Sequence, residues 1–422
     1  MTAALLALNA RTFASLRRHR NYRLYFTGQV ISISGTWMQN IALGWLVYHL
    51  THSAFQVGVL AFLRFIPFTL FALPAGVLAD RFDNRRVLML TQASSMVFAA
   101  ALAGLVVGGD SPVWSVYVLA ALGGIATVFD APNRHALTMQ LVGRNELPNA
   151  VALNASLFNL ARVVGPALAG VLIGAFGAGL CFAINAASFL AVLAALGLMR
   201  PAELYAPKRE GSPQLLRGMR QGLGYVRRAP AIRLILLMTM VVSTVGFNFN
   251  VLIPVLAGKT LHGSGFVFGA LGASFGLGAL GGALLSASMA RASRRMLLVG
   301  GAGFSVALLA LAPLATVWSA ALLLCVTGFF FVAWTSNSQS VLQLTTPDHL
   351  RGRVLSIYLF AFGGFAPIGG LVSGWLADTG GTLLAFSVAG ASCLAVTVYA
   401  AFRWPQGRPE PVRADVEEPL AA

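Results

Sequence analysis

The chain has 422 residues, of which 57% are hydrophobic and only 10% are charged. Soluble globular proteins have about half apolar and about a quarter charged residues, so this composition excludes a protein built of ordinary soluble domains. About 20 apolar residues cross one bilayer core. Twelve crossings therefore use on the order of 260 residues, which leaves no room for a sizeable soluble catalytic domain and predicts an all-α membrane protein.

Six apolar runs form the first half of the chain, and six more form the second half. The first six lie near residues 22–48, 54–79, 87–107, 113–128, 151–175 and 180–198, and the second six near 234–257, 266–289, 297–314, 320–331, 354–376 and 383–402. The predicted organisation is an N-terminal segment (1–21), a six-helix bundle (22–199), a linker (200–233), a second six-helix bundle (234–402) and a tail (403–422).

The net charge of +16 could indicate nucleic-acid binding, but the basic residues follow the membrane sides instead. All but three of the 29 Lys and Arg residues fall in segments that share one side if the chain threads back and forth. The exceptions are Lys259, in a loop on the other side, and Arg64 and Arg162, inside apolar runs. Because basic loops stay in the cytoplasm, both termini are predicted to be cytoplasmic, and no nucleic-acid partner is expected.

The two halves resemble each other in sequence. Gln140-Leu141 and Val151 recur as Gln343-Leu344 and Val354, at a constant offset of 203 residues (343 minus 140). Such repeats are typical of membrane transporters in which two pseudo-symmetric bundles surround a central path.

The connection after the second apolar run carries a pattern of small and charged residues. It reads Gly76-Val77-Leu78-Ala79-Asp80-Arg81-Phe82-Asp83-Asn84-Arg85-Arg86-Val87-Leu88. The pattern resembles the signature between helices 2 and 3 of the major facilitator superfamily, although Asp83 stands where that family usually has glycine. The resemblance covers nearly the whole chain and implies the major facilitator fold. Gly76 is expected to permit a close helix approach, and Arg85 and Arg86 to bind lipid phosphates.

Asp80 has a more specific expected role. Helix 11 enters the membrane from the cytoplasm, which places its positive N-terminal end near Arg353 and Val354, where a carboxylate from the other half is favoured. We therefore expect Asp80 to close a latch on the cytoplasmic side. Asp130 and Arg134, at the cytoplasmic end of helix 4, are assigned to the same gating region. A solvated charge cluster would also explain the arginines of the motif, but not Asp80.

Further segments resemble exporters of the same superfamily. Gly165-Pro166-Ala167-Leu168-Ala169-Gly170 resembles the helix 5 motif of antiporting exporters, with Ala169 in place of one glycine. Pro166 bends the helix and the small residues admit a neighbour, so a purely structural kink stays open. The segments Ser34-Gly35-Thr36-Trp37, Asp130-Ala131-Pro132-Asn133-Arg134 and Asn145-Glu146-Leu147-Pro148 resemble enterobactin-exporter-like proteins. This resemblance implies proton-driven efflux of small amphipathic molecules, siderophores or drugs.

Two arginines lie inside predicted spans. Arg64 lies about 15 Å into helix 2 at 1.5 Å per residue, and Arg162 lies similarly deep in helix 5, with Asn159 on roughly the same side. Charged side chains inside a bilayer face a cavity or a partner, so the pair predicts a positively charged lumen that could take an anionic substrate. A structural role, in which helix carbonyls satisfy each guanidinium, stays open.

Aromatic and amide residues complete the expected substrate site. They are Trp37, Gln39 and Asn40 on helix 1, Asn248 and Asn250 on helix 7, and Tyr358 and Phe362 on helix 11. Core packing is an alternative explanation for each aromatic residue. An unpaired amide is harder to explain in this way, since it costs several kcal/mol in lipid.

Gly276-Leu277-Gly278-Ala279-Leu280-Gly281 fits a dinucleotide-binding pattern, but it lies inside an apolar run without a βαβ unit. We therefore interpret it as a small-residue packing seam that also includes Gly272 and Gly282. The scattered six His and three Cys offer neither a metal site nor a catalytic group. The chain is thus expected to need no cofactor and not to be an enzyme.

The predicted function is a monomeric secondary transporter in the bacterial cytoplasmic membrane. It is expected to export small organic molecules by alternating access, with protons as the coupling ion. No carboxylate falls in the middle of a span, so proton coupling depends on the resemblance, and Asp80 and Asp130 are the nearest candidate carriers. An importer or uniporter of the same fold and a non-transporting membrane receptor or scaffold are the alternatives.

Overall fold

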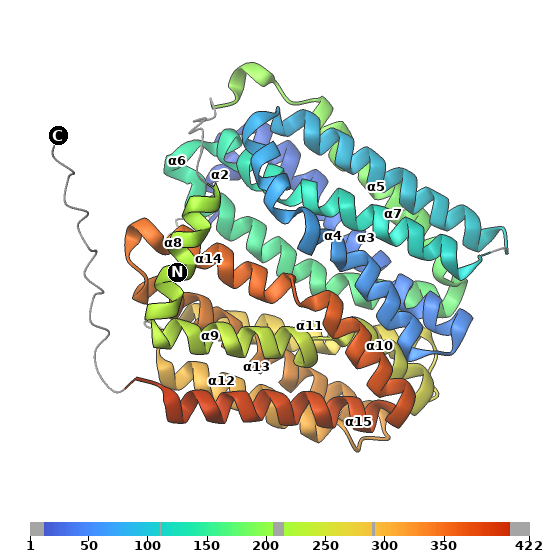
Figure 1. The fold of residues 1–422 in the computed structure, drawn as a ribbon. Coiled ribbons are helices and arrows are strands. Elements are labelled where there is room, and N and C mark those ends of the chain that lie inside the picture. Colours follow the sequence, from blue (N-terminus) through green and yellow to red (C-terminus); the bar gives the residue numbers. More distant parts are fainter. Residues whose placement is uncertain (1–11, 110, 206–214, 289–291, 406–422) are drawn as a thin grey trace, which may run out of the picture.

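The computed structural model describes residues 12–109, 111–205, 215–288 and 292–405, apart from the side chains of Leu73, Val77, Asp80 and residues 215–219. All secondary structure in this part of the chain is helical (Figure 1). The first half contains α2 (Ala14–Arg18), α3 (Arg20–Thr51), α4 (Ala54–Arg81), α5 (Asn84–Val107), α6 (Val113–Phe176) and α7 (Ala178–Gly197).

The linker contains the 3-10 turn η1 (Pro201–Glu203) and helix α8 (Leu215–Arg228). The second half contains α9 (Pro230–Val241), the π-helical segment η2 (Val242–Gly246), α10 (Phe249–Val255), a second π-helical segment η3 (Leu256–Thr260), α11 (Gly265–Ser288), α12 (Arg294–Leu311), α13 (Val317–Thr345), α14 (Asp348–Gly363) and α15 (Ala366–Arg403).

These helices account for the twelve predicted crossings. Nine helical segments of the described chain are long and apolar enough to span a bilayer. Two of them are double, because Gly143 in α6 and Gly381 in α15 adopt positive φ angles of 70° and 68°, which glycine tolerates, and the chain turns back there. Helix α3, with 32 residues, supplies the remaining span.

Several helices extend beyond the predicted apolar runs. The runs were expected to end at Val128 and Phe331, whereas the first arm of α6 reaches Gly143 and α13 reaches Thr345. The extra turns are polar, and their side chains bond inside the bundle, so hydropathy did not reveal them. Likewise, α9 begins at Pro230, inside the segment predicted as linker.

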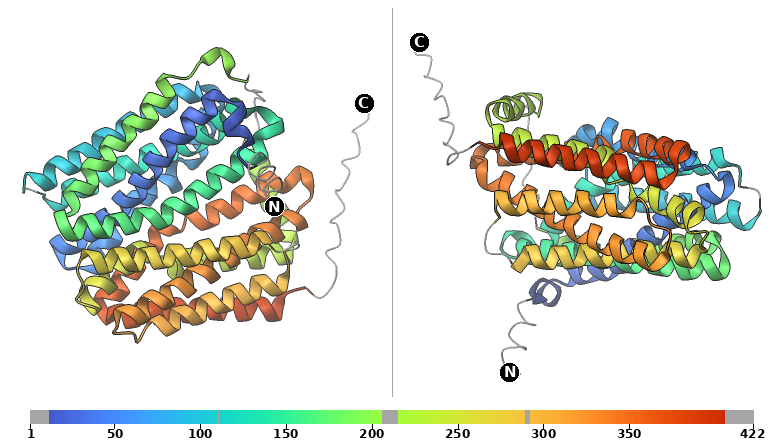
Figure 2. Two further views of the ribbon diagram at one scale, coloured as in Figure 1. Left: turned by 180° about the vertical axis from the view of Figure 1, so that it is seen from behind. Right: turned by 90° about the horizontal axis from the view of Figure 1, so that it is seen from below.

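The two halves, α3 to α7 and α9 to α15, form a V. We call the end of the molecule that carries α2, α8 and Arg403 the terminal end, and the other end the opposite end. Helices of the two halves lie side by side at the opposite end and diverge toward the terminal end, as Figure 1 and the rear view in Figure 2 show. The molecule is therefore closed at the opposite end.

Small residues make this closure possible. A Cβ atom added to Gly170 of α6 would lie 2.6 Å from the Cα atom of Gly269 in α11, and one added to Gly58 of α4 would meet the backbone of Gly370 in α15. Helices can approach this closely only where side chains are absent. The predicted glycine seam of α11 is confirmed, since Gly272 also faces α6.

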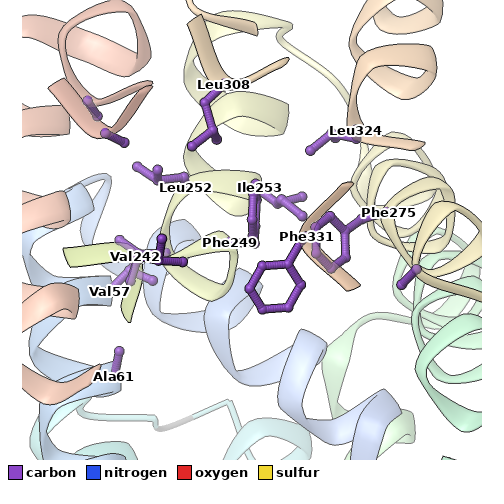
Figure 3. Close-up of a cluster of buried hydrophobic side chains, with 14 of the residues drawn as sticks. Val57, Ala61, Val242, Phe249, Leu252, Ile253, Phe275, Leu308, Leu324 and Phe331 are labelled. Carbon is purple, nitrogen blue, oxygen red and sulfur yellow. The ribbon is translucent and has the colours of Figure 1, made fainter. Parts of the chain in front are cut away.

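One apolar cluster continues across the closed end from one half to the other. Val57 and Ala61 of α4 belong to the same cluster as Val242, Phe249 and Phe331 of the second half (Figure 3). A second cluster, around Tyr22 and Leu137, belongs to the first half alone.

Candidate functional site

The close contacts between the halves end at one level of the molecule. On α3, Tyr48 lies against Gly258 and Ile41 against Gly272, both in the second half. Trp37 and Asn40 precede Ile41 in α3 and lie nearer the terminal end. They therefore lie where the contact between the halves stops. On α6, the contact stops near Arg162, whose carbonyl oxygen would lie 2.8 Å from a Cβ atom at Gly276.

The two intramembrane arginines meet α3 at this level. Nη2 of Arg64 donates a hydrogen bond to Oδ1 of Asn40. The guanidinium carbon of Arg162 lies 5.4 Å from the centre of the Trp37 ring and 5.6 Å from that of Phe158, which suits a cation–π interaction. The structure thus gathers Trp37, Asn40, Arg64 and Arg162 of the predicted site.

Neither guanidinium forms an ion pair with any carboxylate whose side chain the structure describes. A charge inside a membrane normally has such a partner or faces water. Two positive charges therefore lie at the apex of the V, with an amide and aromatic rings as their partners.

The second half contributes two broken helices close to this level. Phe247 and Asn248 leave helical geometry between η2 and α10, and α14 ends at Gly363 before α15 begins. The hydroxyl of Ser243 donates to the carbonyl oxygen of Phe362, and Thr69 of the first half donates to that of Gly364 at 3.0 Å. Discontinuous helices of this kind form substrate sites in transporters, because they expose backbone groups.

Aromatic rings cover these breaks. The Phe247 ring stacks on Phe331 with ring centres 4.2 Å apart, and Phe362 lies 5.6 Å from Phe247. Phe362 therefore belongs to an aromatic wall of the second half. Asn248 is buried beside it, and its amide nitrogen donates to the carbonyl oxygen of Thr244 at 2.9 Å.

The remaining predicted substrate residues make other contacts. Gln39 accepts a hydrogen bond of 2.6 Å from Asn185 of α7, inside the first half. Asn159 donates to the carbonyl oxygen of Ala155 in its own helix. Asn250 is exposed, and Tyr358 is fully buried. The structure thus brings together about half of the predicted set.

A buried polar cluster joins α3, α5 and α6 toward the terminal end. Asp130 accepts hydrogen bonds from Thr91 at 3.1 Å, from Gln92 at 2.6 Å and from two nitrogen atoms of Arg134 at 2.9 Å and 2.5 Å. Arg134 also donates to Gln29 of α3. The sequence pointed to Asp130 and Arg134, but the amide and hydroxyl partners were missed, because they lie on two other helices.

The loop between α4 and α5 differs from the expectation in two respects. Arg85 donates to the carbonyl oxygens of Leu196 at 2.7 Å and Gly197 at 3.2 Å, so it caps the C-terminal end of α7, a role that the sequence did not suggest. Open space surrounds Gly76 among the described residues, so the expected close approach is not made in this conformation. Arg81 and Arg86 are exposed.

Of the predicted latch, the structure describes only the helix that Asp80 was expected to meet. The side chain of Asp80 lies outside the described residues. Arg353 donates to Gln221 of α8. Helix α14 begins at Asp348, which places its positive end more than a turn before Arg353 and corrects the predicted position.

A carboxylate that the sequence did not single out closes the opposite end. Asp378 of α15 accepts hydrogen bonds from the hydroxyl of Ser53 at 2.6 Å and from the backbone nitrogens of Ala54 at 2.7 Å and Phe55 at 3.0 Å. It thereby caps the N-terminal end of α4 in the other half, where a negative charge is favoured. Its position after an apolar run was the only sequence signal.

The Gly165-Pro166 motif packs against two neighbours. A Cβ atom added to Gly165 would lie 3.0 Å from the backbone nitrogen of Met38 in α3, and Pro166 contacts Gly272 of α11. Gly170 meets Gly269 one turn further along. The motif therefore lies at the joint between the halves, as well as within the first half.

Comparisons with known proteins agree with this architecture. Residues 10–420 match the family model of the transmembrane secretion effectors. The chain is 27% identical over 382 residues to the staphyloferrin A transporter of Staphylococcus aureus (strain NCTC 8325 / PS 47), which covers 89% of this chain and 94% of the relative. It is 29% identical over 371 residues to the multidrug efflux pump Tap of Mycolicibacterium fortuitum, covering 84% and 89%. It is 29% identical over 356 residues to the enterobactin exporter EntS of Salmonella choleraesuis (strain SC-B67), covering 81% and 82%.

Solved structures share the fold at low sequence identity. The nucleoside transporter NupG superposes with a TM-score of 0.74 and 10% identity, covering 92% of this chain and all of that one (100%). A bacterial homologue of the lysosomal transporter Spinster, in an inward-facing and unoccupied conformation, gives a TM-score of 0.66 and 14% identity, covering 91% and 95%. With its family model matched over nearly the whole length, the chain belongs to the transmembrane secretion effector family, a branch of the major facilitator superfamily.

Proposed function

We propose that the chain exports small anionic or amphipathic organic molecules from the cytoplasm by alternating access. The observation that carries this proposal is the pair of Arg64 and Arg162, which have no described carboxylate partner and lie at the apex of the V. Guanidinium groups recognise carboxylates and phosphates, and they bind them more strongly where water is scarce. The half-buried rings of Phe247 and Phe362 in the aromatic wall offer a surface to the apolar side of an amphipathic substrate.

The orientation follows from the basic residues. Of the Lys and Arg residues that the structure describes, only Lys259 lies among the loops of the opposite end. The positive-inside rule therefore assigns the terminal end to the cytoplasm. The conformation described above is then the inward-facing state, ready to receive substrate from the cell interior.

Proton antiport is proposed to run through Asp130. Its side chain is 8% exposed and lies within a helix bundle, where a carboxylate can exchange a proton while Arg134 changes partners. Protonation would remove the charge that holds Arg134, and the bonds among α3, α5 and α6 would then rearrange. The named exporters among the relatives, of siderophores and of drugs, support the direction of transport.

Uptake into inside-out membrane vesicles tests the proposal. An anionic siderophore-like compound, a neutral analogue and a lipophilic cation are compared, with an imposed pH gradient that is acidic inside. We expect accumulation of the anionic compound, and its loss when an ionophore collapses the gradient. Accumulation that persists without the gradient would refute proton coupling, and transport of the cation alone would refute the substrate class.

A further inference from the structure

The linker helix α8 lies on the outer side of the bundle at the terminal end. Figure 2 shows it standing out from the second half when the molecule is viewed from below. Gly222 of α8 packs against Arg353 and Ile357 of α14, and the hydroxyl of Tyr225 donates to the carbonyl oxygen of Thr345 at 3.1 Å. The helix is thus fixed to the second half.

An apolar groove of about 340 Å³ lies between α8, α9 and α14. Leu223 of α8, Leu237 and Met240 of α9, and Phe360 of α14 are among its lining residues. Leu223, Leu237 and Phe360 are each about 40% exposed, at 45%, 39% and 41%. Nothing in the described chain covers this apolar surface, which opens beside the terminal end of the membrane-spanning helices.

Positive charge borders the groove, and its lining contains no carboxylate. Arg233 is the one charged residue in its lining, and it is exposed. Arg220 and Arg227 of α8 are exposed as well. The sequence contains no Asp or Glu from Leu215 to Pro347, and Asp348, which follows, pairs with Arg351 at 2.5 Å.

From this arrangement we propose that the groove binds one acyl chain of an anionic phospholipid from the leaflet at the terminal end, with the lipid phosphate on Arg233. The apolar lining matches a hydrocarbon chain, and a guanidinium at the rim matches a phosphate. A volume of this size falls in the range of about 300–1,000 Å³ that holds small ligands. The lining of the groove contains neither Arg64 nor Arg162, so lipid binding there does not depend on which substrate is transported.

Photo-crosslinking in nanodiscs tests this assignment. Phosphatidylglycerol and phosphatidylcholine that carry the same photoreactive acyl chain are compared at equal mole fraction, and the labelled peptides are identified by mass spectrometry. We expect phosphatidylglycerol to label the segments around Leu237 and Phe360 several times more than phosphatidylcholine does. Equal labelling by the two lipids, or labelling spread evenly around the bundle, would overturn the proposal.

Three variants sharpen the test. Arg233→Gln is expected to lower labelling by phosphatidylglycerol about fivefold, the factor that corresponds to the roughly 1 kcal/mol of one basic side chain at an anionic surface. Arg295→Gln, an exposed arginine at the start of α12, is the matched control and should leave labelling unchanged. An equal loss in both variants would show general attraction to the membrane instead of a site. Leu237→Trp, which narrows the groove, should reduce labelling by both lipids.

Discussion

At the scale of single residues, the apex of the V differs from an ordinary membrane interior in its charge. Arg64 and Arg162 are held by an amide and by aromatic rings, partners that orient a guanidinium but do not neutralise it. Asp130, in contrast, is bonded to Arg134 and to two neutral side chains. These two environments suit two tasks, anion binding and proton exchange.

Substitution of either apex arginine should discriminate between substrates by charge. Arg64→Gln and Arg162→Gln are expected to weaken binding of an anionic substrate about tenfold or more, because a hydrogen bond to a charged group contributes about 1.5–3 kcal/mol. Binding of a neutral analogue should change little. Calorimetric titration of the purified protein measures both affinities. An equal loss for both compounds would make the arginines structural.

Substitution of the buried carboxylate should separate exchange from energy coupling. Asp130→Asn keeps the size of the side chain but removes its titration. We expect counterflow, which exchanges labelled for unlabelled substrate without a gradient, to persist, while accumulation driven by a pH gradient is lost. Asn154→Ala is the control, because Asn154 is a polar residue on the second arm of α6 that cannot carry a proton. Retention of gradient-driven accumulation in Asp130→Asn would exclude Asp130 as the carrier.

Residue types were easier to predict than their partners. The sequence pointed to Trp37, Asn40, Arg64 and Arg162, which the structure brings together, because charge and polarity inside an apolar run stand out. It also pointed to Gln39, whose amide instead accepts a hydrogen bond from Asn185 within the first half. Hydropathy alone cannot show which face of a helix meets its neighbour when both faces are apolar or mixed.

At the scale of elements, α4 of the first half and the α14–α15 pair of the second half carry a carboxylate near each end of the membrane. Asp378 caps the start of α4 at the opposite end, and the sequence places Asp80 at the other end of α4, facing the start of α14 once the terminal end closes. The first contact is present in the structure. The contact between Asp80 and the start of α14 stays a prediction, because the side chain of Asp80 lies outside the described residues.

The two carboxylates should therefore act in opposite directions. Asp378→Asn removes the charge at the positive end of α4 and is expected to favour opening of the opposite end, whereas Asp80→Asn should favour the state described here. Opening of the opposite end can be measured with a cysteine introduced at Ala61, inside the closed end. The rate at which an impermeant maleimide labels this cysteine from outside rises as that end opens. We expect a severalfold faster rate in Asp378→Asn and a slower rate in Asp80→Asn. Changes in the same direction in both variants would contradict the paired latches.

The glycine contact between α6 and α11 offers a steric test of the closed end. Gly269→Ala places a methyl group against the backbone of Gly170, where neither helix can yield without moving apart. We expect a shift toward opening at the opposite end, or a lower melting temperature in detergent. Gly123→Ala, in open space on α6, is the matched control and should change neither. Identical behaviour of the two variants would contradict close packing at Gly269.

Element boundaries show the limit of hydropathy. The terminal-end turns of α6 and α13 contain buried polar residues, such as Asp130 and Asn337, that form hydrogen bonds inside their own halves, and this weakens the apolar signal there. The capping roles of Asp83, which accepts from the backbone nitrogens of Arg85 and Arg86, and of Asp378 were also missed. Capping depends on backbone groups that the sequence does not mark.

At the scale of the whole molecule, composition, the basic loops and the internal repeat were sufficient to predict the twelve spans and the two halves. The conformation could not be predicted in this way, since one sequence serves both the inward-facing and the outward-facing state. The glycine seams and the Asp378 cap hold the halves together at the opposite end, while the helices are separated at the terminal end. These features become visible only in the three-dimensional structure.

The central claim is that the two halves rock about the level of Arg64 and Arg162, so that the two ends open alternately. Spin labels at Ser111 and Trp318 report the opposite end, and labels at Leu198 and Phe402 report the terminal end. Distances between the spin labels are measured by electron–electron resonance in nanodiscs. We expect the main population to have a short distance at the opposite end and a long distance at the terminal end. In Asp378→Asn, the opposite-end distance should lengthen and the terminal-end distance should shorten together. Distances that change at one end while the other stays fixed, or that do not respond at all, would contradict alternating access by this protein.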